Sequence, residues 1–304
     1  MNKLMRWLAA LVIVAVPQML RAEAPIDFDG DGISDLTVYR NGAWWIQRSN
    51  TSSTSVSFFG LTADTTVPAD YDGDGSTDRA IWRNGVFWTS RSTDGAVTVF
   101  PWGTSGDDPR VVADYDNDGK ADYAIYRPST GTYWIRRSSD QVTKIVKWGQ
   151  SGDLPLPGNF VGSAHADYCV YRPSTNTYWV LDSQTLAVSV VPFGNAATDR
   201  FVAMDRVGTS SIDFSVFRSS GVDAGDWYWQ SAQGVTAFEP AFGLAGDLPL
   251  PFVETFGGKS SLALVRNQGG QFRWYRRQNS GGSFSNVAWG LSTDVIPAYA
   301  FFTR

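Results

Sequence analysis

The sequence predicts an all-β fold, a six-bladed β-propeller of four-stranded antiparallel blades. One pattern recurs six times within the 304 residues, and its arginine markers lie 43 to 48 residues apart. Apolar residues alternate or form short runs that Gly, Pro, Asn or Asp interrupt. A period in the forties with four short strands is typical of propeller blades, whose sheets cover one another when stacked radially. Six repeats predict six blades and 24 strands with almost no helix; seven blades are the alternative.

Each repeat begins with a strand that ends in Arg and continues into a strand built on Trp. A third strand ends in an aromatic–Gly pair, an Asp follows, and a fourth, usually Pro-containing, strand completes the repeat. The second residue of the first strand is always small, so we expect Cys169 there to be a core residue rather than a reactive thiol. The repeated residues are Arg40, Arg83, Arg127, Arg172, Arg218 and Arg266; Trp45, Trp88, Trp134, Trp179, Trp229 and Trp274; and Asp64, Asp107, Asp153, Asp199, Asp247 and Asp294.

The C-terminus is expected to close the ring. If the Pro-containing strand is the innermost one, five blades are continuous in sequence. The remaining blade combines an inner strand at 295–301 with outer strands from 36–60, and this splice removes an exposed sheet edge. The chain has a single Cys, so no intrachain disulfide can stabilise the fold.

Residues 1–22 are predicted to be a signal peptide, and residues 23–304 a single propeller domain. Lys3 and Arg6 precede a short apolar run, and Ala22 supplies a small residue at the cleavage point. The mature chain then has 22 basic and 30 acidic residues, a formal charge of −8, which argues against nucleic acid as a partner. No stretch reaches transmembrane length. We therefore expect a secreted or periplasmic protein without membrane insertion.

Three acidic nine-residue loops precede the first strands of repeats one to three. They read DFDGDGISD (27–35), DYDGDGSTD (70–78) and DYDNDGKAD (114–122), with Asp at positions 1, 3, 5 and 9. Gly at position 6 permits a sharp turn, and a carbonyl at position 7 adds a further oxygen, a set that favours Ca²⁺ over Mg²⁺. The predicted ligands of three structural calcium ions are Asp27, Asp29, Asp31, Ile33, Asp35, Asp70, Asp72, Asp74, Ser76, Asp78, Asp114, Asp116, Asp118, Lys120 and Asp122.

Two alternatives compete with calcium sites of this kind. An EF-hand requires a bidentate Glu at position 12, where Val38, Ile81 and Ile125 stand, and helices on both sides. Ordinary surface turns are also rich in Asp and Gly. However, four carboxylates within nine residues repel one another unless a cation neutralises them, and three equivalent copies argue against coincidence.

The corresponding loops of repeats four to six have lost most of these acids. Repeat four keeps Asn159 and Asp167, and repeat five keeps Asp205 and Asp213. Repeat six is interpreted as a shorter loop that retains Glu254 alone. We expect no metal in these loops, and we expect the sole His, His165, to be a solvated loop residue.

The acidic loop before a strand, the Phe-Gly or Trp-Gly ends and the period in the forties resemble the FG-GAP/VCBS repeats of integrin-α-like propellers and secreted bacterial proteins. The resemblance covers residues 25–304. It implies Ca²⁺ at the four Asp of each of the first three loops. The departures are the three degenerate loops and six repeats in place of the seven of integrin heads. The family includes adhesion proteins, lectin-like proteins and a few polysaccharide-cleaving enzymes, so it does not identify the ligand.

The repeated Arg and Trp residues each allow two interpretations. The arginines can ring an anion, but the six repeated Asp favour structural Arg–Asp ion pairs that link blades. The repeated Trp are expected in the interblade core. Trp44, Trp82 and Trp227, which do not repeat, are the better candidates for a ligand surface, although core positions are favoured for them too.

The sequence favours a binding or adhesion module over an enzyme. It contains no nucleophile motif, no His-rich metal site and no acid pair outside the acidic loops. The expected partner is a protein or cell-surface ligand. A carbohydrate-binding lectin is the first alternative, and a lyase or hydrolase acting on polysaccharides is the second.

Overall fold

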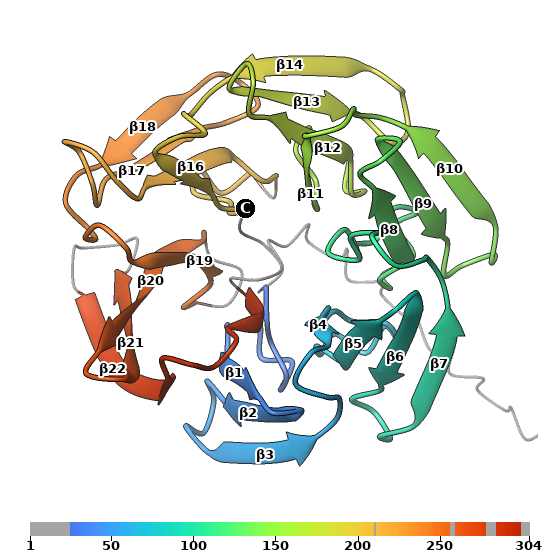
Figure 1. The fold of residues 1–304 in the computed structure, drawn as a ribbon, viewed down its shortest axis with the longest axis horizontal. Coiled ribbons are helices and arrows are strands. Elements are labelled where there is room, and N and C mark those ends of the chain that lie inside the picture. The colour runs from blue at the N-terminus through green and yellow to red at the C-terminus, as the bar shows by residue number, and fades with distance from the viewer. Residues whose placement is uncertain (1–24, 210, 256–258, 278–283, 299–304) are drawn as a thin grey trace, which may run out of the picture.

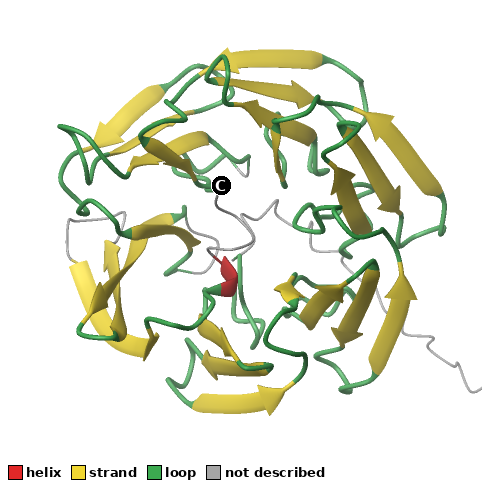
Figure 2. Cartoon of the chain, viewed as in Figure 1, coloured by secondary structure: helices red, strands yellow, loops and turns green. Residues whose placement is uncertain are grey.

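The computed structural model describes residues 25–209, 211–255, 259–277 and 284–298, which form a six-bladed β-propeller (Figure 1). The predicted signal peptide lies outside the described residues. Strands supply nearly all the regular structure, and within the described ranges the helical residues are 297 and 298 (Figure 2). The all-β class and the six blades are therefore confirmed.

Four blades have four antiparallel strands each, in sequence order from the inside outward. Blade two consists of β4 (Thr65–Thr66), β5 (Arg79–Arg83), β6 (Val86–Ser90) and β7 (Val97–Pro101). Blades four, five and six consist of β11 (Leu154–Leu156), β12 (Tyr168–Arg172), β13 (Thr177–Leu181) and β14 (Val188–Pro192); β15 (Asp199–Phe201), β16 (Phe214–Arg218), β17 (Trp227–Gln230) and β18 (Thr236–Glu239); and β19 (Leu248–Phe252), β20 (Ser261–Gln268), β21 (Gln271–Arg277) and β22 (Phe284–Leu291).

Blades one and three have three strands each in the described chain. Blade one holds β1 (Leu36–Arg40), β2 (Ala43–Gln47) and β3 (Thr54–Phe58), and blade three holds β8 (Tyr123–Arg127), β9 (Thr132–Arg136) and β10 (Thr143–Lys147). Their inner strands reduce to single antiparallel bridges, Tyr39 with Val295 and Asp108 with Tyr126. The described ranges thus contain 22 strands where 24 were predicted.

The C-terminal segment makes one bridge to blade one where a strand was predicted. Tyr39 and Val295 exchange both backbone hydrogen bonds, at 2.8 and 3.0 Å. In blade four the ladder continues two residues further along the innermost strand, to Leu156. The equivalent residue here is Pro297, which has no N–H to donate and therefore ends the ladder. The rest of the predicted strand, 299–301, lies outside the described residues, so closure by a C-terminal strand stays a prediction.

The core consists of apolar clusters between neighbouring blades. Residues of β5 are buried on both faces, whereas β3 alternates between exposed and half-buried side chains. This difference arises because inner sheet regions are stacked on both sides and outer strands face solvent. The small second residue of each first strand is buried as predicted, and burial raises the pKa of the Cys169 thiol well above its usual range. Cys169 is therefore a core residue, not a reactive thiolate.

Candidate functional site: three acidic loops

The acidic loops lie between the innermost segment of a blade and its Arg-ending strand. In each, the carboxylate at position 1 holds the turn by accepting backbone N–H groups of positions 4 and 6. Asp27 accepts from Gly30 and Gly32, both at 2.7 Å. Gly30 adopts a φ of 72°, which few other residues tolerate. The same pair of bonds recurs at Asp70 and Asp114.

The carboxylate at position 9 ties the loop to the neighbouring hairpin. Asp35 accepts the backbone N–H of Phe28, within the loop, and that of Ser49, after β2, both at 2.7 Å. Asp78 and Asp122 accept the equivalent pairs of N–H groups. Backbone hydrogen bonds thereby fix the carboxylates at both positions 1 and 9.

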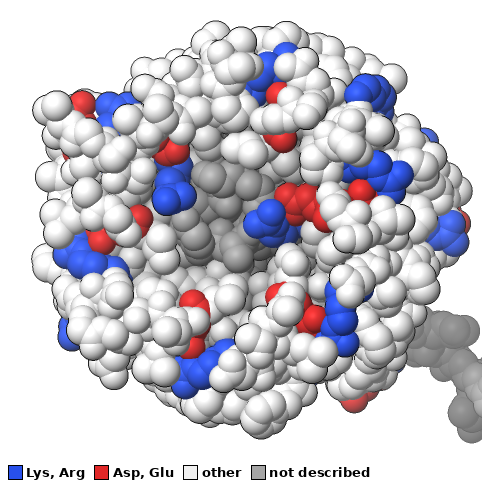
Figure 3. Space-filling model, in the orientation of Figure 1, with Lys and Arg blue, Asp and Glu red and all other residues white. Residues whose placement is uncertain are grey.

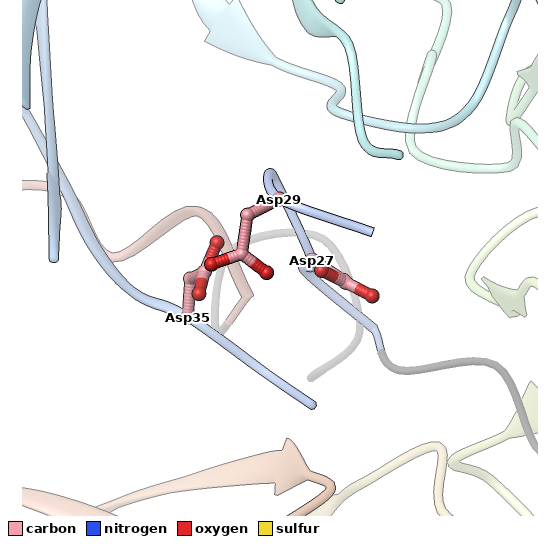
Figure 4. Close-up of side chains that lie close together, drawn as sticks. All are labelled: Asp27, Asp29 and Asp35. Atoms are coloured by element: carbon pink, nitrogen blue, oxygen red, sulfur yellow. The ribbon is translucent and has the colours of Figure 1, made fainter. Parts of the chain in front are cut away.

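Three carboxylates come together in each loop, from positions 1, 3 and 9. One oxygen from each lies within 4.8 Å of the others in the groups Asp27–Asp29–Asp35, Asp70–Asp72–Asp78 and Asp114–Asp116–Asp122. Figure 4 shows the first group, with the carboxylates of Asp29 and Asp35 turned toward each other and Asp27 beside them. Nine of the predicted ligands are thus gathered into three equivalent groups.

Two of the three position-3 carboxylates carry a buried oxygen that lacks a hydrogen bond. These atoms are Asp29 Oδ2 and Asp116 Oδ1. The side chain of Asp116 is only 7% exposed, and its other oxygen accepts the hydroxyl of Ser139 at 2.5 Å. A buried carboxylate oxygen without a partner is costly. A cation between the three carboxylates would satisfy it, so the donor set fits a hard divalent ion.

Burial also raises the pKa of the clustered carboxyls. Desolvation, with a smaller contribution from neighbouring Asp residues, raises the pKa of Asp35 to about 7, of Asp78 to about 6 and of Asp122 to about 7. The pKa values of Asp27, Asp70 and Asp114 are raised for the same first reason. A bound cation would favour the ionised forms and oppose these shifts.

The position-5 carboxylates lie outside the three-carboxylate groups. Asp31, Asp74 and Asp118 each accept a serine hydroxyl from the turn after the second strand, Ser49, Ser92 and Ser138, at 2.7 to 2.8 Å. Their assignment as ligands stays a prediction, as does that of the carbonyls of Ile33, Ser76 and Lys120.

The later loops keep the backbone frame but lack the position-3 acid. Val161 and Val207 stand at position 3 of loops four and five. Asp167 and Asp213 remain at position 9, and each accepts N–H groups from positions 2 and 3 with one oxygen. His165 lies half-buried in loop four beside Gln184. Burial raises the pKa of both Asp167 and Asp213 to about 6, so a raised pKa at position 9 does not by itself mark a metal loop.

Loop six has the same spacing as the others, contrary to the shorter loop expected. Its position 1 is Val253 and its position 8 is Ser260, because these residues make the same interloop hydrogen bonds as positions 1 and 8 elsewhere. Glu254 therefore occupies position 2, where its side chain lies 3.7 Å from the guanidinium of Arg276.

A ring of backbone hydrogen bonds joins the six loops. The N–H at position 8 of one loop donates to the carbonyl at position 1 of the preceding loop. The ring includes Thr77 to Asp27 at 2.6 Å and Ala121 to Asp70 at 2.7 Å, and it closes with Ser34 to Val253 at 2.8 Å. Neighbouring acidic loops are therefore directly bonded to each other through residues at or beside their carboxylate groups.

At the other end of the Arg strands, each blade has one of the predicted Arg–Asp ion pairs, although both partners belong to the same blade and do not link two blades. The closest N–O distances run from 2.6 to 2.9 Å for Arg40–Asp294, Arg83–Asp64, Arg127–Asp107, Arg172–Asp153, Arg218–Asp199 and Arg266–Asp247. Each Asp begins the innermost segment of the blade that contains its Arg, so the pair anchors the connection from the preceding blade. Figure 3 shows basic and acidic side chains adjacent at intervals around one face.

An aromatic ring stacks under each of these arginines. The rings belong to Trp45, Trp88, Trp134, Trp179, Tyr228 and Tyr275, with guanidinium carbon to ring centroid distances of 4.7 to 5.8 Å. The strand register places Tyr228 and Tyr275, not Trp229 and Trp274, at the repeated position in blades five and six. The predicted equivalence is wrong there because WYWQ and FRWYRR each place the Trp one residue from the matching position.

The suggested ligand-surface tryptophans are core residues. Trp44 and Trp227 are fully buried and Trp82 is 8% exposed. Their indole N–H groups donate to carbonyls of the aromatic–Gly ends, Phe59, Phe242 and Trp102, at 2.7 to 3.1 Å. The core alternative was therefore correct for all three.

The sequence interpretation did not predict a cleft of about 460 Å³ between blades five and six. Its lining includes Tyr275, Arg277 and Phe284. The available signal was that Tyr and Phe replace residues of a different type at repeat positions, which becomes clear once the strand register is known.

Comparison with known proteins supports the fold alone. No protein-family model matches the chain, and no curated protein matches it. A solved lectin of Agrocybe aegerita that recognises non-reducing terminal N-acetylglucosamine is similar, with a TM-score of 0.54, 14% identity, and coverage of 88% of this chain and 92% of the lectin.

Two other similar structures have lower TM-scores. BBS1 in complex with ARL6 has a TM-score of 0.46 at 11% identity, covering 88% of this chain and 80% of that one. A protein from Lactobacillus plantarum has a TM-score of 0.47 at 12% identity, covering 88% and 87%. In the described chain, no helix has the length and apolarity that crossing a bilayer requires.

Proposed function

We propose that this chain is an exported, calcium-stabilised β-propeller that acts as a binding module. The observation that carries the calcium proposal is the triplicate carboxylate group, in which two position-3 side chains bury an oxygen without a hydrogen-bond partner. Carboxylate oxygens are the ligands of hard cations. Calcium tolerates the irregular geometry of a loop site, whereas Mg²⁺ demands a near-ideal octahedron and gives up its waters reluctantly.

The calcium ions are structural in this proposal. The loops tie the innermost segment of a blade to its second strand and to the next loop, so a bound ion stiffens the junctions of blades one to three. Each ion also offsets the repulsion among its carboxylates. Export, proposed from residues 1–22, would expose the protein to abundant calcium. Bound calcium would then stabilise a fold that has no intrachain disulfide.

The binding role follows from the remaining chemistry. Outside the acidic loops, the repeated acids and arginines pair with each other, which gives them a structural role at each blade. We therefore place the molecule among binding proteins, with a protein or cell-surface partner, rather than among enzymes. A lectin is the second candidate, favoured by the similarity to the Agrocybe aegerita lectin. A polysaccharide lyase or hydrolase ranks third.

The test combines isothermal titration with a ligand screen on the mature protein. Titration of calcium into chelator-treated protein is expected to reveal three sites; none would refute the calcium proposal. A glycan array that measures binding, together with an assay for depolymerisation of the bound glycans, then distinguishes a lectin, an enzyme and a protein-binding module. Sugar binding without product formation indicates a lectin, and depolymerisation indicates an enzyme. If neither is observed, a protein partner is the favoured ligand.

A further inference from the structure

The cleft between blades five and six is lined by aromatic and charged side chains. Its walls come from the Phe242–Gly243 end of blade five and from β20 to β22 of blade six, and they include Arg266, Tyr275, Arg277 and Phe284. Figure 1 shows the two blades side by side, with β18 next to the β21–β22 edge. At about 460 Å³ the cleft falls within the range of small-molecule sites.

The cleft exists where large side chains have been replaced by smaller ones. In blades one to four a Trp stands opposite the central residue of the Arg strand, while blade six has Tyr275 opposite Leu264. At the junctions after blades two and three, Trp102 and Trp148 donate their indole N–H across to the next blade at 3.2 and 3.1 Å. Phe242 occupies that place after blade five and has no such donor. The junction between blades four and five carries the same pair of residue types, Phe193 and Tyr228, so these replacements accompany the cleft without by themselves accounting for it.

Phe284 places an exposed aromatic ring at a position where the other blades carry smaller residues. It pairs with Arg277 at the start of the outer strand and is 63% exposed. The equivalent residues elsewhere are all smaller, namely Thr54, Val97, Thr143, Val188 and Thr236. An exposed phenyl ring in place of Thr or Val has no role in the repeated blade packing, so it points to contact with a ligand.

Arg277 and Tyr275 in the cleft lining, with Glu239 beside Arg277 just outside the lining, offer both donors and acceptors. Arg277 pairs with Glu239 at 2.6 Å, and both side chains stay partly exposed, at 31% and 26%. The hydroxyl of Tyr275 accepts from Gln268 at 2.8 Å and keeps its own proton to donate. Arg266 forms a bidentate ion pair with Asp247, so it lines the cleft as a structural residue.

We propose that this cleft binds one ring of a neutral sugar. An aromatic ring packs against the apolar C–H face of a pyranose, while adjacent hydroxyls both donate and accept, as the Arg277–Glu239 pair requires. An apolar peptide side chain would desolvate that ion pair without replacing its hydrogen bonds. The formal charge of −8 on the mature chain disfavours acidic sugars. This inference rests on the binding role proposed above and favours its second candidate, the lectin; it is independent of calcium.

The experiment measures binding of neutral pyranosides, including glucose, galactose, mannose, N-acetylglucosamine and their short oligomers, by saturation-transfer NMR and calorimetry on the calcium-loaded mature protein. Tyr275→Trp restores the residue type of blades one to four and is expected to fill the cleft. Phe284→Thr restores the residue type of blades one, three and five on an exposed site, so folding is retained. Each variant is expected to weaken binding at least tenfold. Phe58→Ser removes an exposed aromatic from blade one and is the matched control.

The outcomes are distinct. Loss of binding in both cleft variants, with none in Phe58→Ser, supports the proposal. Sugar binding that survives both variants places the site elsewhere and overturns it. Silence across the panel, or binding of an apolar peptide in place of sugar, overturns the sugar assignment. A melting temperature that still falls on chelation would show that the calcium proposal stands even then.

Discussion

The first three acidic loops and loops four and five share the described part of one backbone frame but differ in charge. Both sets bond to the next loop through positions 1 and 8, and both bury an Asp with a raised pKa at position 9 wherever that acid is retained. Gly at position 4 keeps a positive φ in loops one, two, four and five. What differs is position 3, where Asp29, Asp72 and Asp116 give way to Val161 and Val207.

The comparison shows that the same backbone hydrogen bonds form in loops with and without the position-3 acid. The turn at position 1 is held by backbone N–H groups in loop five as in loop one, through Asp205 and Gly208. The capacity for a cation is therefore added to an existing frame by acids at positions 3 and 5. In loops four and five one oxygen of the position-9 Asp accepts two N–H groups, including that of Val161 or Val207, while the other oxygen of Asp213 is buried without a hydrogen-bond partner.

The largest expected effect is that of chelation on stability. An ion that binds only the folded state contributes about 2.7 kcal/mol per site at 100-fold excess over its dissociation constant. With three sites, and at about 2–4 °C per kcal/mol, EDTA should lower the melting temperature by roughly 10 °C or more. Differential scanning calorimetry with and without EDTA measures this. An unchanged melting temperature would contradict the proposal that loops one to three bind structural calcium and loops four to six do not.

Single substitutions should locate that effect in the first half of the ring. Asp72→Ala and Asp116→Ala each remove one position-3 carboxylate and should lose up to one third of the calcium-induced rise in melting temperature. Val207→Ala is the matched control at position 3 of loop five, and Asp205→Ala tests the retained acid of that loop. Both controls should keep the full calcium-induced rise, although Asp205→Ala loses the bonds to Gly208 and Thr209 under either condition.

The response to pH should have opposite sign in the two states. Asp35 and Asp122 have folded pKa values of about 7, above the unfolded value of about 4. Between these pH values the calcium-free folded protein therefore binds more protons than the unfolded chain. The stability of the chelated protein therefore falls as pH rises from about 4 to 7. Calcium requires the ionised carboxylates, so its stabilisation grows over the same range. Melting curves at pH 5.5 and 8 should show a larger calcium effect at pH 8; an equal effect would contradict carboxylate ligation.

The repeat and its loops were predictable because period, turn residues and acid spacing are local features. Contacts made by distant residues were not. Asp31 accepts a hydrogen bond from Ser49, eighteen residues later in the chain, and this bond depends on the position of a hairpin that only the folded structure reveals. Pro297 ends the inner ladder because of its register against blade one. The Tyr at the stacking position of blades five and six was hidden because neighbouring tryptophans matched the motif more closely.

The smallest expected effect, and the sharpest test of the comparison, is to rebuild a metal loop in blade four. Loop four keeps Asn159, Asp167 and the Gly162 turn, so the double variant Val161→Asp/Ser163→Asp restores acids at positions 3 and 5 on an intact frame. Without calcium it should be less stable than the parent, because three carboxylates then share one loop. With calcium it should regain stability by about 1–3 kcal/mol, and titration should count one additional site. The Asn isosteres, Val161→Asn/Ser163→Asn, are the matched control without new charge. If the acidic variant binds no additional ion, features beyond positions 3 and 5 distinguish the two halves of the ring.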